Sequence, residues 1–60
     1  MKNITDFYDN YIAVGDTIQL VENHYIVGKC VKADTEIIQV AGHNNIYNLY
    51  CKNVIAIKRS

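Results

Sequence analysis

Proline and tryptophan are absent from this 60-residue chain, and glycine and cysteine are scarce, with three and two copies. Without proline, no stretch has the composition of a stiff linker, so we expect a single domain over residues 1–60. No apolar run approaches the ~20 residues that cross a bilayer, and the polar first residues lack the apolar segment of a signal peptide. We therefore expect a cytoplasmic protein with no membrane contact.

Net charge is absent as well, since six basic and six acidic side chains balance. This balance excludes a protein that coats nucleic acid by charge alone. Half of the residues are hydrophobic and 20% are charged, which is too apolar for intrinsic disorder. A chain this short buries a small core, and such domains usually gain stability from disulfides, metals or partner subunits.

The first residues carry apolar side chains at the spacing of one helix face. These are Ile4, Phe7, Tyr8, Tyr11 and Ile12. The pattern predicts a short α-helix over about residues 4–12, which Gly15 would end. Its aromatic stripe would either bind a partner or close one end of the domain, and closure avoids a large exposed apolar surface.

After Gly15, alternating and β-branched stretches separated by turn residues replace the helical spacing. These stretches predict strands at about residues 16–22, 25–32, 36–41, 46–51 and 54–58. Gly28 lies inside the longest of them, where a glycine favours a bend or bulge. One short helix and five short strands predict a mainly β fold, a strongly bent antiparallel barrel with the outline of SH3-like and Sm-like barrels.

Two stretches of the chain resemble the Sm-like family, and its Hfq-like branch in particular. From Asp16 to Gly28, the apolar positions and the glycine match the first family motif in register, and Asp34 falls where the family usually has an aspartate. The stretch from Tyr50 to Ile57 looks like the second motif. The expected order of a helix, a strand, a tight turn and a long strand broken by glycine is also similar, so the resemblance covers nearly the whole chain. It implies a ring of subunits that binds RNA or nucleotides on one face.

The chain also departs from the Hfq-like pattern. Cys51 and Lys52 follow the tyrosine where Hfq-like proteins have Lys-His. Ala33 and Glu36 stand near the family aspartate position, where an aromatic residue would stack on bases. The polybasic rim of the family is missing too, so the departures concern the RNA-binding groups and not the fold.

Two corners of the expected barrel carry candidate ligand-binding groups. At the first hairpin, Tyr25 would stack on a base while Asn23 and His24 bond to its edge, or the three residues form an ordinary turn. At the corner after the fourth strand, the resemblance implies an inner ring rim where Lys52 meets a phosphate, whereas the alternative is a core tyrosine beside a solvated lysine. The full set of candidates for RNA binding is Asn23, His24, Tyr25, Lys29, Tyr50, Lys52 and Asn53.

The fourth and fifth strands are expected at the two open edges of the sheet. Residues 54–57 carry no charge and no proline that would block pairing with another chain. If the fifth strand paired with the fourth strand of a neighbour, a homo-oligomeric ring would close and would stabilise the small domain. The candidate interface residues are Ile46, Tyr47, Leu49, Val54, Ile55 and Ile57.

Catalytic and metal-binding patterns are not recognisable. Cys30 and Cys51 are expected to be reduced and buried, and with His24 and His43 they lack the local ligand pairs of zinc sites. We therefore expect no enzyme, no metal and no cofactor. The leading hypothesis is a homo-oligomer that binds RNA or nucleotides, and the alternative is a small regulatory or inhibitor protein of a phage or mobile element that binds a protein partner.

Overall fold

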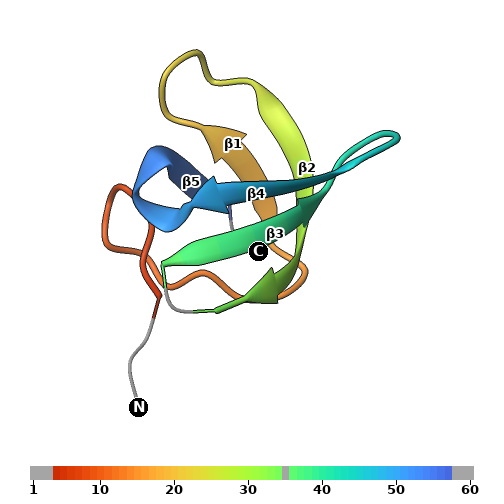
Figure 1. Ribbon diagram of the computed structural model, residues 1–60. Coiled ribbons are helices and arrows are strands. Elements are labelled where there is room, and N and C mark those ends of the chain that lie inside the picture. The colour runs from red at the N-terminus through yellow and green to blue at the C-terminus, as the bar shows by residue number, and fades with distance from the viewer. Residues whose placement is uncertain (1–3, 35, 58–60) are drawn as a thin grey trace.

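The protein is a single antiparallel sheet that curls over its own core (Figure 1). The computed structural model describes residues 4–34 and 36–57, so the expected end of the fifth strand at residue 58 lies outside the described residues. The strands are β1 (Thr17–Leu20), β2 (Ile26–Ala33), β3 (Ile37–Ala41), β4 (Ile46–Tyr50) and β5 (Val54–Ile57). Each one lies within two residues of its expected range, and the fold is mainly β as predicted.

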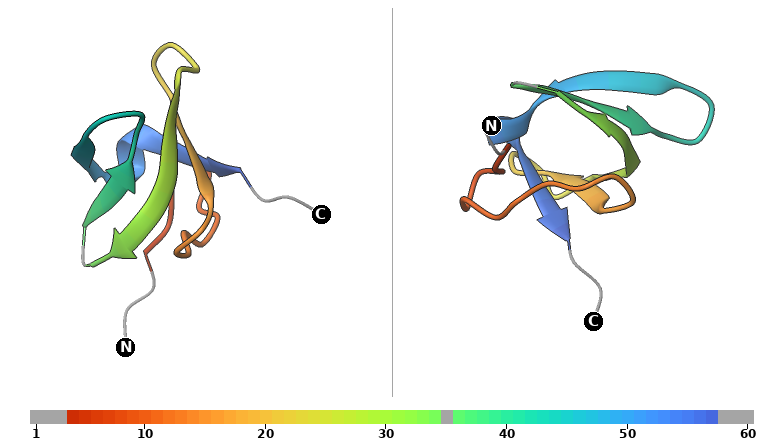
Figure 2. Two further views of the ribbon diagram at one scale, coloured as in Figure 1. Left: turned by 90° about the vertical axis from the view of Figure 1, so that its right-hand side faces the viewer. Right: turned by 90° about the horizontal axis from the view of Figure 1, so that it is seen from below.

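The strand order in the sheet is β4-β3-β2-β1-β5, which places β4 and β5 at its two ends. Seen from below, β3 and β4 form one layer, β1 and β5 form the other, and the long β2 joins them (Figure 2). A 3₁₀ turn, η1 (Cys51–Asn53), leads from β4 to β5. No pairing joins β4 to β5 within the described ranges, so the expectation of a closed barrel is wrong and the sheet stays open.

The bend of the sheet occurs in β2, where the sequence predicts it. Gly28 faces Ile18 of β1, and a Cβ atom at this position would lie 1.9 Å from the backbone oxygen of Ala41 in β3. The pairing shifts register on both sides of this close approach, between Ile18 and Gln19 and between Cys30 and Lys32. A side chain at residue 28 would therefore separate β2 from β3, which explains the glycine.

The expected α-helix over residues 4–12 is not present, and an irregular hairpin takes its place. Thr5 and Tyr11 form a β-bridge, the amide of Ile12 donates to the oxygen of Ile4 at 2.9 Å, and Asp9 has a φ of 64°. The carboxylate of Asp6 holds the tip of this hairpin, because its Oδ1 accepts from the amides of Tyr8 and Asn10. An aspartate that bonds to nearby amides in this way competes with helix formation.

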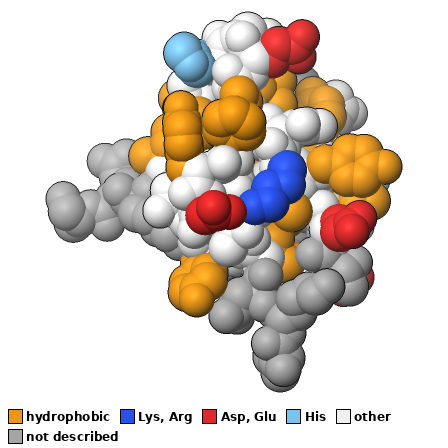
Figure 3. Space-filling model, turned by 90° about the vertical axis from the view of Figure 1, so that its left-hand side faces the viewer, with side chains coloured by type: hydrophobic (Ala, Val, Ile, Leu, Met, Phe, Trp, Pro, Cys, Tyr) orange, Lys and Arg blue, Asp and Glu red, His pale blue; other side chains and the backbone are white. Residues whose placement is uncertain are grey.

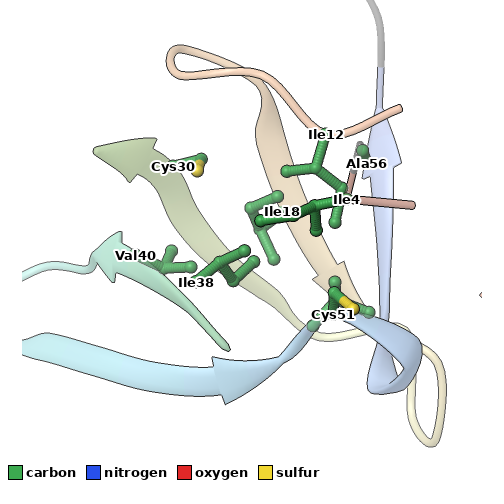
Figure 4. Close-up of a cluster of buried hydrophobic side chains, with 9 residues drawn as sticks. Ile4, Ile12, Ile18, Cys30, Ile38, Val40, Cys51 and Ala56 are labelled. Atoms are coloured by element: carbon green, nitrogen blue, oxygen red, sulfur yellow. The ribbon is translucent and has the colours of Figure 1, made fainter. Parts of the chain in front are cut away.

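Both ends of this hairpin face the core. This explains why apolar residues recur there at a spacing that resembles one face of a helix. Ile4 and Ile12 are buried beside Ile18 and Ala56 (Figure 4). By contrast, the aromatic side chains of the hairpin, Phe7, Tyr8 and Tyr11, are all more than half exposed. The apolar residues therefore divide between the core and the surface and do not form one buried stripe. The remaining members of the core are Cys30, Ile38, Val40, Cys51 and Val54.

The hairpin also covers the outer edge of β5. The amide of Val21 donates to the oxygen of Asn53, so these two residues form a hydrogen-bonded pair between β1 and β5. Hydrogen-bonded pairs alternate along an antiparallel ladder, and the N–H and C=O groups of Val54 and Ala56 therefore point away from β1. The amide of Phe7 donates to the oxygen of Val54 at 2.9 Å, and the amide of Ala56 donates to Oδ2 of Asp6 at 2.8 Å. A second strand pairing with β5 would have to displace these two bonds, which is why the sheet does not close here.

Candidate functional site

The residues predicted to bind RNA lie at three separate places. Asn23, His24 and Tyr25 occupy the turn between β1 and β2, and Lys29 and Tyr50 pair with residues of β3. Lys52 and Asn53 belong to η1. The structure therefore offers no single surface on which all seven candidates meet.

The turn between β1 and β2 uses its polar groups to hold its own shape. Oδ1 of Asn23 accepts from the amide of Tyr25 at 3.0 Å, and the side chain of Gln19 donates to the oxygen of His24 at 3.1 Å. His24 has a φ of 61°, a conformation that turns tolerate. These contacts account for Asn23 as a turn residue, while the Tyr25 ring stays exposed.

Lys52 is bound to the N-terminal hairpin. Its Nζ lies 2.8 Å from Oγ1 of Thr5, 3.1 Å from the oxygen of Asp6 and 2.8 Å from Oδ1 of Asp9. The hydrogen bond to Asp9 raises the pKa of Lys52. An ammonium has three donors, and each has an acceptor here, so a phosphate would have to displace one of these partners.

Tyr50 is 58% exposed, so it is not the core tyrosine that was considered as an alternative. It lies opposite Ile37 in the β3–β4 pair, on the sheet face turned away from the buried Ile38 and Val40. Lys29 lies on the same outer face of β2, opposite Ala41. Two of the predicted ligand-binding residues thus lie on this outer face, Tyr50 on β4 and Lys29 on β2.

The described residues form an open groove of about 450 Å³ between the N-terminal hairpin, the end of β1 and η1. Its lining residues are Phe7, Leu20, Val21, Glu22, Leu49, Lys52 and Asn53. We call these seven residues the η1 groove. Figure 3 shows the side of the molecule that carries η1 and the hairpin, where hydrophobic side chains gather around a lysine.

The sequence identified only part of the η1 groove. Lys52 and Asn53 were predicted to bind a ligand, and Leu49 was predicted to lie at a subunit interface. Phe7 was placed on a helix and its apolar neighbours Leu20 and Val21 within a strand, so none of the three was expected in a groove. The one sequence signal that bears on Phe7 is its place in the aromatic stripe, which is expected either to bind a partner or to close one end of the domain.

A second, smaller hollow of about 260 Å³ lies on the outer face of the sheet. Its lining residues are Lys32, Asp34, Ile37, Gln39 and Asn48. Polar groups of both charge signs surround one isoleucine here, so this hollow offers less apolar contact than the η1 groove.

The predicted interface residues differ in accessibility. Val54 is fully buried in the core, and Leu49, Ile55 and Ile57 are partly buried. Ile46 and Tyr47 in β4 are exposed. Because Val54 faces the core of its own chain, its side chain is not available to a neighbouring subunit.

Both cysteines are free and buried, as expected for reduced thiols. Burial raises the pKa of the Cys30 thiol, which also donates to the oxygen of Lys32 at 3.5 Å. A neutral, buried thiol is a poor nucleophile. Across residues 4–34 and 36–57, no group of three or more histidine, cysteine or acidic side chains is placed to hold a metal ion.

No helix among the described residues has the length and apolar character needed to cross a membrane. Comparison of the chain with protein-family models, with curated proteins and with solved structures finds no match.

Proposed function

We propose that this chain is a non-enzymatic protein-interaction module, and that it binds an apolar side chain of a partner peptide in the η1 groove. The groove itself carries this proposal. It is open to the surface, and Phe7, which is 51% exposed, lines it together with Leu20 and Leu49. Exposed aromatic and aliphatic side chains around a hollow are typical of surfaces that anchor a partner residue.

The charges around the groove favour a peptide over RNA. The ammonium of Lys52 is already paired with Asp9, and the acidic residue Glu22 is among those that line the groove. A phosphate would meet one satisfied cation and one anion, whereas an apolar side chain would meet the aliphatic and aromatic wall. The zero net charge of the chain supports the same choice.

The wider assignments belong to the same proposal. The resemblance of residues 16–28 and 50–57 to Sm-like motifs supports a binding role, and the two free, buried cysteines support a reducing, cytoplasmic location. No cofactor and no metal are part of this function.

A peptide library displayed on phage tests the proposal, with the purified protein as the target. The enriched peptide is synthesised with a fluorophore, and its affinity is measured by polarisation. Phe7→Ala should weaken binding by about tenfold or more, because it removes the wall of the groove. Tyr11→Ala is the matched control, since this exposed aromatic lies on the same hairpin but outside the groove, and its affinity should stay unchanged.

Two outcomes would overturn the proposal. One is a library that yields no peptide, or a peptide whose binding is insensitive to Phe7→Ala. The other is tight binding of a labelled single-stranded RNA pool that weakens with salt and is lost in Lys52→Glu and Tyr25→Ala. The second result would establish RNA binding in place of peptide binding.

A further inference from the structure

The two edges of the sheet differ in how they are protected. The outer groups of β5 at Val54 and Ala56 are bonded to the N-terminal hairpin through Phe7 and Asp6. Nothing comparable covers β4, because among the described residues no hydrogen bond reaches β4 from the side opposite β3. An open edge of this kind is a template for pairing with another strand.

The pairing with β3 fixes which backbone groups of β4 are free. The amide of Gly42 donates to the oxygen of Asn45 at one end, and the amide of Cys51 donates to the oxygen of Glu36 at the other. In an antiparallel pair, hydrogen-bonded positions alternate along the strand. The N–H and C=O groups of Ile46, Asn48 and Tyr50 therefore point away from β3, toward the open edge.

β4 lacks the features by which proteins block an exposed edge. It has no charged residue, no proline and no shift of register along its five residues. Ile46 and Tyr50 are 57% and 58% exposed, so both leave apolar surface beside the free backbone groups. The edge is thus suited to accept a strand.

We propose that β4 pairs with β4 of a second copy of this chain, antiparallel and with Asn48 on the two-fold axis. The free backbone groups at Ile46, Asn48 and Tyr50 are spaced symmetrically about Asn48, so the strand is complementary to itself. In this register, Ile46 lies opposite Tyr50 of the partner subunit, and aromatic–β-branched pairs of this kind stabilise a sheet. β4 is uncharged, so self-pairing brings no like charges together.

The same geometry favours a closed dimer over a ring. A ring built from β4 of one subunit and β5 of the next would need the β5 edge, which Asp6 and Phe7 occupy. Pairing of β4 with β4 uses the same surface on both subunits and closes after two copies. The interface shares only Leu49 with the η1 groove. A test of dimerisation can therefore fail or succeed whether or not the groove binds a peptide.

A charge-swap experiment tests the register directly. Asn48→Lys and Asn48→Asp each place two like charges opposite one another at the axis, and each variant alone should dissociate at about fivefold or more higher concentration than the unmodified chain. An equimolar mixture of the two variants places Lys opposite Asp, so the mixture should regain the dimer as a heterodimer. Sedimentation measures the association constants, and native mass spectrometry identifies the mixed pair. Asn10→Lys, an exposed control outside β4 and outside the η1 groove, should leave the dimer unchanged.

Three results would overturn the proposal. The first is an unmodified chain that sediments as a monomer at the highest soluble concentration. The second is association that survives each Asn48 variant unchanged, and the third is a ring of more than two copies. Recovery of the mixed dimer also shows that both variants fold, because unfolded chains would not pair selectively.

Discussion

At the scale of single residues, Asp6 links the N-terminal hairpin to β5. It is fully buried, and its carboxylate accepts from the amides of Tyr8 and Asn10 with one oxygen and from the amide of Ala56 with the other. One side chain therefore shapes the hairpin and attaches it to β5. A buried carboxylate is tolerated because its lone pairs are satisfied by backbone donors.

Asp6→Asn is expected to lower the free energy of unfolding by about 2–4 kcal/mol, although the two side chains have nearly the same shape. Whichever way the amide is turned, its NH₂ group faces a backbone donor and not an acceptor. Denaturant unfolding followed by circular dichroism measures the change. Asp34→Asn, at an exposed aspartate, should change stability by less than about 0.5 kcal/mol. Equal stability of the two variants would show that the Asp6 contacts contribute little.

At the scale of secondary-structure elements, the strands were predictable and the hairpin was not. Alternation of apolar residues and local turn residues determine where β1 to β5 lie, and both are visible in the sequence. The hairpin depends on the contact of Asp6 with Ala56, 50 positions along the chain, which no local pattern reveals. The helical interpretation of Phe7 misses the apolar part of the η1 groove. Lys52 and Asn53 do line this groove, and their role in ligand binding stays a prediction.

Lys52 fastens this hairpin to η1, and its removal is expected to loosen the hairpin alone. In Lys52→Met, the amides of Tyr8 and Asn10 should exchange with solvent faster, by less than about tenfold, because exposed ion pairs contribute modestly. Amides in β2 and β3 should keep their protection. Hydrogen exchange followed by NMR gives both readouts, and Lys32→Met serves as the control at an exposed lysine of β2. Unchanged exchange in the hairpin would mean that Lys52 contributes little and that the bonds of Asp6 and Phe7 to β5 hold the hairpin.

The pH dependence of this contact follows from the direction of the pKa shift. The hydrogen bond to Asp9 raises the pKa of Lys52 in the folded chain. The contribution of the Lys52 ammonium to the stability of the fold is therefore complete below the ordinary lysine pKa of about 10.4. It is lost as the pH rises through the raised value. The contact is therefore intact at neutral pH.

At the scale of the whole molecule, the core that the described residues form contains nine buried apolar side chains, in a chain of 60 residues. Domains of this size have little stability to spare, and here neither a disulfide nor a metal group among the described residues adds to it. Association of two copies through β4 would add a second source of stability, because a dimer that binds only folded chains shifts the folding equilibrium.

The melting temperature is therefore expected to rise with protein concentration. If the folded chain is dimeric throughout, a hundredfold increase in concentration stabilises each chain by about 1.4 kcal/mol, which raises the melting temperature by roughly 5–10 °C in a domain this small. Scanning calorimetry on a dilution series measures the shift. Asn48→Lys, which repels its own copy across the axis, should show a much smaller dependence. A melting temperature that is constant over the series for the unmodified chain would mean that the monomer is stable without its partner, and the open edge of β4 would then require another explanation.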